Sequence, residues 1–468
     1  METIRFGTDG WRGVIAREFT FDRVARVAVA AAEVLAEAHA NPQAPLLVGY
    51  DRRFLSEEFA QAAAQAAAAA GFRVLLASQA ASTPAFSYGV RHHGAMGALV
   101  ITASHNPPVY NGLKVKGAFG GSIPPEMTQQ IEMRLAQPAV DRPGGTVTSF
   151  DPWPDYVQAL QQQVDVPGIR AGLQHWQVWV DPMHGAAAGG LTRILGQAVQ
   201  EIRTQRDVLF GGHPPEPLPP YLEELRTTMQ QHRGHQVGLV FDGDGDRIAA
   251  MDGQGQFLSP QVLIPVLIEH LAQRRGLQGT VVKTISGSEL IAKTAAYYGL
   301  PVVETPIGFK YIAQEMLKGG VLLGGEESGG IGYGHYLPER DALLSALYLL
   351  EAVAMTQKPL EVLYRELQAK TGFTSVYNRI DLHLSDASCR DRLLQELADH
   401  APTTIAETPV VKTWSGDGYK FYLADQSWLL IRFSGTEPLL RLYCESPTPE
   451  RGQAILAWAR HWAESTAQ

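Results

Sequence analysis

Apolar runs of strand length alternate with alanine-rich or amphipathic stretches along the first three quarters of the chain. The run LLVGYD (46–51) predicts a strand, and the alanine-rich stretch 56–70 predicts a helix with Gly71 at its C-terminal cap. The runs FRVLLA (72–77) and ALVITA (98–103) predict two further strands. This order is typical of a βαβ arrangement.

The same alternation returns twice further along the chain. WQVWVDPMHGAAAGG (176–190) leads through a glycine-rich turn, and VGLVF (237–241) predicts another buried strand. A third unit contains TVVKTISGSELIAKTAAYYG (280–299), LPVVETPIGFKYI (300–312) and VLLGG (321–325). We therefore expect three α/β units, with ligands bound by the loops at the carboxyl ends of their strands.

The pattern changes after about residue 371. SVYNRIDLHL (375–384), KFYLADQSWLLIRFSG (420–435) and LLRLYCES (439–446) alternate like antiparallel strands, whereas 393–400 and 454–465 are helical in pattern. The last domain is thus predicted to be α+β. Proline- and glycine-rich stretches near residues 140, 253 and 372 mark the predicted limits. The predicted domains are 1–145, 146–253, 254–370 and 371–468.

Composition supports a folded protein of several domains. Its 468 residues are too many for one hydrophobic core, because single cores stop growing at roughly 250 to 300 residues. The formal net charge of -9 argues against nucleic acid or an anionic membrane as the main partner, since both select for basic patches. A small anionic substrate would instead depend on a local cluster of arginine and lysine.

Cysteine usage and the start of the chain favour a cytoplasmic protein. The two cysteines, Cys389 and Cys444, form no CxxC pair, so a disulfide framework or cysteine-bound zinc is not expected. The start METIRFGTDGWRG lacks the apolar stretch of a secretory signal, and VLIPVLI, broken by Pro265, is too short to span a membrane.

The segment TASHNP (102–107) places Ser104 in a loop directly after a predicted strand. Such a position suits a nucleophile. The four residues SHNP are equally typical of an ordinary turn. A Ser-His-Asp hydrolase is less favoured, because His105 is adjacent in sequence and no GxSxG motif is present.

The segment FDGDGDR (241–247) alternates three aspartates with glycines. Asp242, Asp244 and Asp246 can aim three carboxylates at one point, and magnesium prefers such oxygen ligands together with water and phosphate. An EF-hand would need glycine and glutamate where Arg247 and Gly253 stand, which rejects it. The remaining alternative is a solvated acidic turn, which three mutually repelling carboxylates disfavour.

Two further loops carry groups suited to a sugar phosphate. In RFSGTEPLLR, guanidinium groups, hydroxyls and backbone amides meet around one turn, as a phosphate dianion requires. In GGEESGG (324–330), Glu326, Glu327 and Ser328 follow a strand and suit pairs of sugar hydroxyls. Taken alone, either segment is also compatible with an ordinary surface loop.

Five segments, in this order and over nearly the whole chain, resemble the motifs of the α-D-phosphohexomutase family. They are FGTDGWRG (6–13), TASHNPPVYNGLK (102–114), DGDGDR (242–247), GGEESGG (324–330) and RFSGTEP (432–438). The resemblance implies four domains around a central cleft: three related α/β domains with mixed sheets, and a C-terminal α+β domain like the TATA-binding protein. A hinge is expected near residues 370–373.

The resemblance also implies roles for individual residues. Ser104 is the phosphorylated nucleophile, and a phosphoserine oxygen binds Mg²⁺ together with Asp242, Asp244 and Asp246, with Arg247 stabilising the cluster. The residues that read the sugar hydroxyls are Glu326 and Ser328. The residues that clamp the non-reacting phosphate are Arg432, Ser434, Gly435, Thr436 and Arg441. The candidates for transition-state charge and proton transfer are Arg12, His105, Lys114 and Lys310.

The implied reaction interconverts glucose 1-phosphate and glucose 6-phosphate through glucose 1,6-bisphosphate. The GEES and GFKYI segments favour glucose, whereas RFSGTEP is also similar to members that act on glucosamine phosphate. Mannose and glucosamine phosphates are therefore the alternatives. A phosphatase using the same serine, or a non-catalytic sugar-phosphate sensor, is less favoured because Ser104 and all three aspartates are present. We expect a monomer or homodimer whose partner is a phosphosugar.

Overall fold

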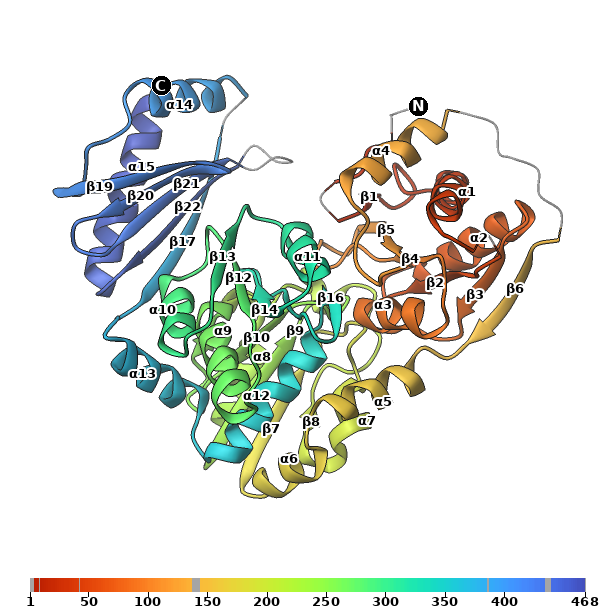
Figure 1. Cartoon of the computed structure of the whole chain (residues 1–468), viewed down its shortest axis with the longest axis horizontal. Helices are drawn as coiled ribbons and strands as arrows, with labels where there is room; N and C mark the ends of the chain where they lie inside the picture. The colour runs from red at the N-terminus through yellow and green to blue at the C-terminus, as the bar shows by residue number, and fades with distance from the viewer. Residues whose placement is uncertain are drawn as a thin grey trace.

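The computed structural model describes residues 4–7, 9–41, 43–136, 144–384, 387–433 and 439–467. It contains four sheets, and each belongs to one successive part of the chain. The first part, red to orange, and the last part, blue, lie on opposite sides of the view in Figure 1, with the second and third between them. Three α/β parts followed by an α+β part confirm the predicted fold class.

The first sheet has the strand order β1-β5-β4-β2-β3-β6. β2, β3, β4 and β6 run parallel, whereas β5 pairs antiparallel with β4 and β1, so the sheet is mixed. Its strands are β1 (Trp11–Val14), β2 (Leu46–Tyr50), β3 (Arg73–Ala77), β4 (Gly97–Ile101), β5 (Tyr110–Gly117) and β6 (Thr146–Phe150). Its helices are α1 (Phe21–Ala38), α2 (Ser56–Ala69), α3 (Thr83–His92) and α4 (Pro125–Arg134). The strands and the helix predicted between residues 46 and 103 are thereby confirmed.

The second sheet has the order β11-β10-β9-β7-β8, and β9 and β10 form an antiparallel hairpin. Its strands are β7 (Trp176–Asp181), β8 (Gln200–Glu201), β9 (His235–Phe241), β10 (Ile248–Met251) and β11 (Phe257–Leu258). Its helices are α5 (Trp153–Gln163), α6 (Val166–Gly172), α7 (Gly190–Leu195) and α8 (Glu223–Gln230), with 3-10 turns η1 (Gly196–Ala198), η2 (Phe210–Gly212) and η3 (Pro219–Tyr221). The turn of the β9–β10 hairpin carries the three aspartates.

The third sheet has the order β13-β12-β14-β15-β16, with β12, β13 and β14 parallel. Its strands are β12 (Thr280–Thr284), β13 (Val302–Thr305), β14 (Val321–Gly325), β15 (Ile331–Tyr333) and β16 (Leu337–Arg340). Its helices are α9 (Pro260–Glu269), the π-helix η4 (His270–Arg274), α10 (Glu289–Tyr297), α11 (Phe309–Lys318), α12 (Ala342–Thr356) and α13 (Leu360–Thr371). α12 is apolar around nearly its whole circumference, and it is buried in a core that the first three parts share.

The fourth sheet is antiparallel throughout, in the order β17-β22-β21-β20-β19-β18. Its strands are β17 (Val376–His383), β18 (Thr404–Ile405), β19 (Thr408–Gly416), β20 (Gly418–Leu423), β21 (Trp428–Phe433) and β22 (Leu439–Ser446), and its helices are α14 (Ala387–Asp399) and α15 (Pro449–Ala467). A separate core lies between one sheet face and the helices. The other face carries Trp428 and Tyr443, which pack against Ile285 of the third part.

Two further observations bear on the predictions. The predicted domain limits stay predictions. The first predicted domain ends at residue 145, just before β6, which begins at Thr146 and pairs with β3 in the first sheet. No helix within the described ranges has both the length and the apolar character that a membrane crossing needs.

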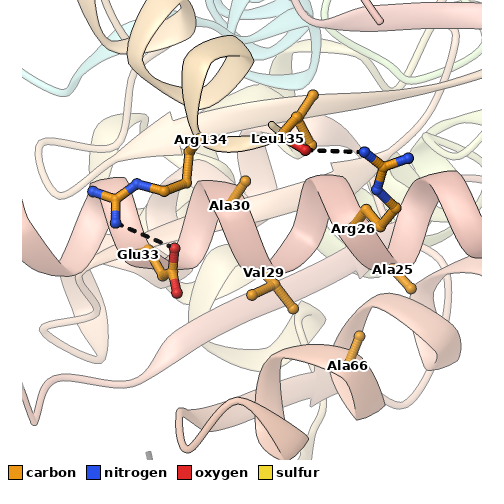
Figure 2. Close-up of a pocket in the computed structure, with 8 residues that line it drawn as sticks. All are labelled: Ala25, Arg26, Val29, Ala30, Glu33, Ala66, Arg134 and Leu135. Carbon is orange, nitrogen blue, oxygen red and sulfur yellow. Dashed lines mark hydrogen bonds and ion pairs between the residues drawn. The ribbon is translucent and has the colours of Figure 1, made fainter. Parts of the chain in front are cut away.

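A pocket lies on the first part between α1, α2 and the end of α4, and Figure 2 shows the residues that line it. Arg26 donates to the Leu135 carbonyl at 2.9 Å, and Arg134 pairs with Glu33 at 3.5 Å. None of its lining residues is a predicted site residue. The predicted chemistry is therefore located elsewhere.

Candidate active site

The serine loop leaves the end of β4 and is held by hydrogen bonds. Ser104 is buried and adopts the left-handed backbone conformation, with φ of 53°, and its N–H donates to Thr102 Oγ1 at 2.9 Å. The buried Arg53 guanidinium donates to the carbonyl oxygens of Ser104 and Asn106 at 2.6 and 2.7 Å. A strained residue fixed in this way is typical of a functional site.

The serine and aspartate loops meet although 138 residues separate them in sequence. Ser104 Oγ donates to Asp242 Oδ2 at 2.8 Å, and both side chains are buried. His105 Nδ1 lies 3.3 Å from the same hydroxyl. Burial, together with the charges of Arg247 and Arg12, lowers the pKa of His105 well below its usual value. The imidazole is therefore neutral near neutral pH and able to take up a proton.

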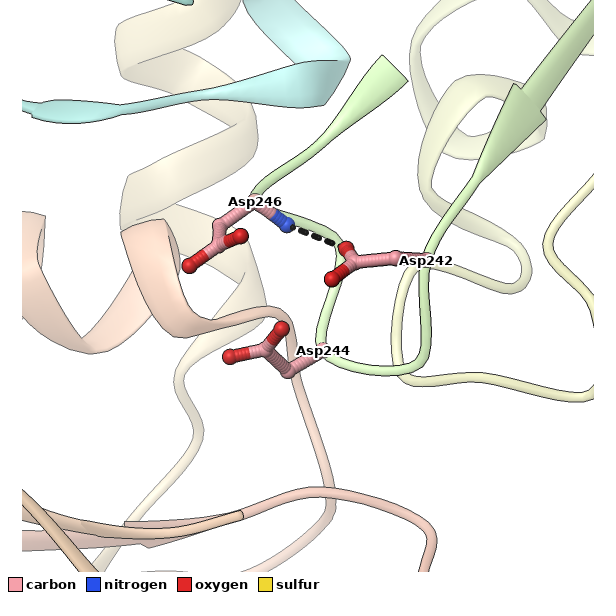
Figure 3. A group of neighbouring side chains, drawn as sticks. All are labelled: Asp242, Asp244 and Asp246. Carbon is pink, nitrogen blue, oxygen red and sulfur yellow. Dashed lines mark hydrogen bonds between the residues drawn. The ribbon is translucent and has the colours of Figure 1, made fainter. Parts of the chain in front are cut away.

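The three aspartates form a compact cluster. Figure 3 shows their carboxylates gathered beside the turn, and each offers one oxygen within 4.8 Å of the others. The backbone N–H groups of Asp246 and Arg247 donate to Asp242 Oδ1, both at 3.1 Å. At Gly245, where φ is 68°, an added Cβ would lie 2.9 Å from the Cβ atoms of two neighbouring side chains. The glycine spacing thus permits this tight turn.

The donor set of the cluster fits a hard divalent cation. Asp244 Oδ1 and Asp246 Oδ1 are buried without a hydrogen-bond partner among the described residues. Burial and the two neighbouring carboxylates raise the pKa of Asp242 well above its usual value. A cation would satisfy the two oxygens and relieve this repulsion.

Lys114 lies against the aspartates. Its Nζ is 2.8 Å from Asp244 Oδ2, 2.8 Å from Asp246 Oδ2 and 2.9 Å from Asp9 Oδ2. Burial lowers the pKa of Lys114, but the three carboxylates outweigh it and raise the pKa above its usual value. Lys114 is therefore a fixed positive charge in this arrangement, which suits charge neutralisation better than proton transfer.

Sequence reasoning missed several charged residues of this network. Arg340 Nη2 lies 2.5 Å from Asp9 Oδ2 and 2.8 Å from Asp246 Oδ2, so it links the third part of the chain to the first and second. Two strand positions along from Lys114, the buried Lys116 contacts Glu339. The segments LKVKG and LPER form buried strands, and the charged residues within them were the signal that could have found this network.

The sugar loop lies beside the aspartate loop. Arg247 forms a β-bridge with Gly330, and the Ile248 N–H donates to the Gly329 carbonyl at 3.0 Å. Arg247 Nε is 3.9 Å from Asp246 Oδ1, and Arg12 contacts the Asn106 side chain. Both arginines thus lie around the loops of the serine and the aspartates.

The carboxyl group of Glu326 is buried and accepts from the Gly308 N–H at 3.1 Å. Burial raises the pKa of Glu326 to about 7. Glu327 accepts from Ser286 Oγ at 2.6 Å, whereas Ser328 is only partly buried. Lys310 is also partly buried, with Nζ 5.0 Å from the ring centre of Tyr311.

The described part of the phosphate loop places two arginines side by side. Arg432 and Arg441 are directly opposite across β21 and β22. Arg379 on β17 was missed by sequence reasoning, and its guanidinium lies 5.4 Å from the ring centre of Tyr443 on the same sheet face. The three other predicted clamp residues, Ser434, Gly435 and Thr436, lie outside the described residues.

Glu216 lies near basic groups from two parts of the chain. Burial raises the pKa of this carboxyl, and the nearby charges of Arg247, Arg379 and Arg441 oppose that rise. Its loop adjoins the aspartate loop, because the Gly243 N–H donates to the Pro215 carbonyl at 3.1 Å. Contributions from all four parts of the chain therefore converge on one region.

A buried hydroxyl against a carboxylate cluster, with guanidinium groups around it, is typical of enzymes that transfer phosphoryl groups with a divalent cation. Comparison with known families agrees. Models of the phosphoglucomutase/phosphomannomutase alpha/beta/alpha domains I, II and III match residues 3–140, 154–255 and 259–371, and the model of the C-terminal domain matches 391–459. The chain belongs to this family, within the α-D-phosphohexomutase superfamily.

Individual relatives cover nearly the full chain. A phosphoglucosamine mutase from Levilactobacillus brevis is 31% identical over 95% of both chains. The crystal structure of a candidate phosphomannomutase from Thermus thermophilus has a TM-score of 0.87, with 35% identity over 99% of both chains. An N-acetylphosphoglucosamine mutase from Aspergillus fumigatus, solved with GlcNAc-6P and magnesium, shares the fold with a TM-score of 0.60 at 13% identity, over 100% of this chain and 96% of its own.

Proposed function

We propose that this chain is a phosphohexomutase that moves a phosphoryl group between the 1- and 6-oxygens of a hexose through phosphorylated Ser104. The observation that carries the proposal is the contact between Ser104 Oγ and Asp242 Oδ2 at 2.8 Å, beside two further aspartates with unpartnered oxygens. Asp242, Asp244 and Asp246 would hold Mg²⁺ together with an oxygen of the phosphorylated serine. The cation would neutralise charge on the phosphoryl oxygens.

The chain's own residues support both halves of the reaction. In the first half, the bond between phosphorus and Ser104 Oγ breaks while a bond to a hexose hydroxyl oxygen forms. The hexose hydroxyl loses its proton, and Ser104 Oγ takes up a proton. The His105 imidazole lies 3.3 Å from Ser104 Oγ, on the side of the serine oxygen rather than of the attacking hexose hydroxyl, so it suits proton exchange with the serine. Arg12 and Arg247 provide positive charge beside the transferred group.

The second half returns a phosphoryl group to the serine. A hexose 1,6-bisphosphate turns around, and Ser104 Oγ loses its proton and bonds to the other phosphorus. The bond from that phosphorus to the hexose oxygen breaks, and the hexose oxygen takes up a proton. The phosphate clamp must therefore accept either end of the sugar. Its proposed residues are Arg432, Ser434, Gly435, Thr436 and Arg441. Glu326 and Ser328 would read hydroxyls that stay in equivalent places in both orientations, while Lys114 and Lys310 would add positive charge.

For the hexose, we infer glucosamine phosphate as the preferred substrate. Eight relatives named phosphoglucosamine mutase or probable phosphoglucosamine mutase are 29% to 31% identical over 95% to 98% of the chain. Carboxyl groups of Glu326 and Glu327 would suit an ammonium group at C2, which glucose lacks. These relatives favour glucosamine over the glucose predicted from the GEES and GFKYI segments. Cytoplasmic location and a monomeric or homodimeric state stay predictions.

The test is a coupled assay of the 1-phosphates of glucosamine, glucose and mannose, each primed with its own 1,6-bisphosphate and Mg²⁺. We expect 6-phosphate formation to be fastest with glucosamine and to be abolished in Ser104→Ala, without change in the circular dichroism spectrum. Faster turnover of glucose 1-phosphate than of glucosamine 1-phosphate would instead support glucose, the hexose predicted from the sequence. Release of inorganic phosphate without 6-phosphate, or full activity of Ser104→Ala, would reject the mutase.

A further inference from the structure

One carboxylate connects the phosphate clamp to the third part of the chain. Asp417 is the single residue between β19 and β20, and its side chain is 28% exposed. Its Oδ1 accepts from Arg432 Nε at 2.9 Å, and its Oδ2 accepts from the Ile307 N–H at 3.0 Å. Each oxygen of Asp417 therefore holds a different part of the chain.

The connection continues to the sugar loop through the next backbone amide. The Gly308 N–H, adjacent to Ile307, donates to Glu326 Oε1 at 3.1 Å. Both amides immediately precede Phe309, the first residue of α11. The N-terminal end of a helix attracts negative charge, so it favours both carboxylates. Arg432 is thus linked to Glu326 through the Asp417 carboxylate and the successive backbone amides of Ile307 and Gly308.

We propose that Asp417 is a positioning residue that fixes Arg432 of the phosphate clamp relative to Glu326 of the sugar loop. The inference rests on the proposed mutase function, in which one sugar must span the clamp and the sugar loop in two orientations. A guanidinium held at Nε keeps its two terminal nitrogens for a phosphate. Because Asp417 also holds the Ile307 amide, the clamp is oriented against the element that holds Glu326.

Other contacts hold the fourth domain in place. Tyr377 Oη donates to the Ser286 carbonyl at 2.9 Å, and Lys420 Nζ donates to the Ile285 carbonyl at 2.8 Å. The Glu289 N–H donates to the buried Glu445 carboxylate at 2.8 Å. Loss of the Asp417 contacts should therefore leave the domain folded and docked, and should alter the orientation of Arg432.

A neighbouring turn provides a matched control. Asp425, between β20 and β21, accepts from Arg451 Nε at 2.6 Å and from the Ser427 N–H at 3.0 Å. Its side chain is 32% exposed, close to that of Asp417. Asp425 thus repeats the pattern of one arginine and one backbone amide, but all of its partners lie in the fourth domain.

The experiment compares Asp417→Asn with Asp425→Asn in the full-length protein. Because the loss of a charge-assisted hydrogen bond changes an equilibrium constant by about tenfold, we expect the KM for the hexose 1-phosphate to rise about tenfold in Asp417→Asn. Its kcat should change by less than about twofold, because the clamp contacts the non-reacting phosphate in ground and transition states alike. Asp425→Asn should leave the KM unchanged. Hydrogen exchange at the Ile307 amide should accelerate only in Asp417→Asn.

An unchanged KM in Asp417→Asn, or an equal rise in both variants, would overturn the inference. A fall in kcat at constant KM would also overturn it, because that result would place Asp417 in the chemical step. If the wild-type protein interconverts no hexose phosphate, the proposed function has failed instead. Hydrogen exchange at Ile307 would then still show whether Asp417 holds that amide, because it requires no turnover.

Discussion

Replacement of Lys114 by methionine would test whether the aspartate cluster is the cation site. Lys114 Nζ lies within 2.9 Å of Asp9, Asp244 and Asp246, and its side chain is 1% exposed. Methionine preserves most of the side-chain volume but removes the charge, so the carboxylates lose a buried counter-charge. Removal of one partner from a buried ion pair typically costs about 3–5 kcal/mol, a large part of the roughly 5–15 kcal/mol that stabilises a domain.

Magnesium should offset this loss. A ligand at about one hundred times its dissociation constant stabilises the folded state by about 2.7 kcal/mol, and a cation on the aspartates replaces part of the missing charge. We therefore expect Lys114→Met to unfold at clearly lower urea concentration than wild type in EDTA. Because the variant lacks the Lys114 charge that opposes a cation in wild type, it should bind Mg²⁺ more tightly, so the difference in unfolding free energy should shrink in saturating Mg²⁺.

Lys116→Met is the control for this experiment. Lys116 lies on the same strand and is equally buried, but it contacts Glu339, the Ser122 hydroxyl and, at 3.8 Å, Asp9 rather than Asp242, Asp244 or Asp246. Its replacement should destabilise the protein by a similar amount with and without Mg²⁺. If Mg²⁺ rescues both variants equally, or neither, the cation does not bind at Asp242, Asp244 and Asp246.

Two further predictions concern stability. Burial raises the pKa of Asp341, the N-cap of α12, to about 7 in the folded protein, against 3.8 for the free side chain. As the pH rises from about 4 to 7, the stability of wild type should therefore fall relative to that of Asp341→Asn, by roughly 4 kcal/mol at most. A difference in thermal unfolding temperature between the two proteins that stays constant across these pH values would contradict this. Gly372 follows α13 with φ of 63°, and an added Cβ would meet no described atom within 4 Å. Gly372→Ala should thus cost about 1 kcal/mol through backbone strain alone, and an unchanged unfolding midpoint would argue against it.

Local patterns in the sequence predicted the elements and the loops between them. The apolar runs at 46–51, 72–77 and 98–103 correspond to β2, β3 and β4. β2 and β4 are buried along their whole length, and a strand buried on both faces needs a continuous apolar run. The aspartate spacing predicted a cluster, because alternating glycines permit a tight turn that gathers three carboxylates. Both signals lie within a few residues of chain.

Pairings between distant segments could not be predicted in this way. Asp9 and Arg340 are 331 positions apart, and nothing local to either residue indicates its partner. Asp417 looks like any turn aspartate until the structure places Ile307 and Arg432 against it. Such residues depend on how whole domains pack, which the periodicity within one element does not determine.

The electrostatics of the site imply that phosphorylation of Ser104 and cation binding are coupled. In the unmodified protein the Ser104 hydroxyl donates to Asp242, a carboxyl group whose pKa burial and its two neighbours raise. Phosphorylation removes that donor and adds nearly two negative charges at the same place. A divalent cation between the phosphate and the carboxylates would turn this repulsion into attraction, so each event should increase the affinity for the other. Titration of the phosphorylated protein and of Ser104→Ala with Mg²⁺ should therefore show tighter binding by the phosphorylated form. Equal affinities would mean that the cation does not contact the phosphoserine.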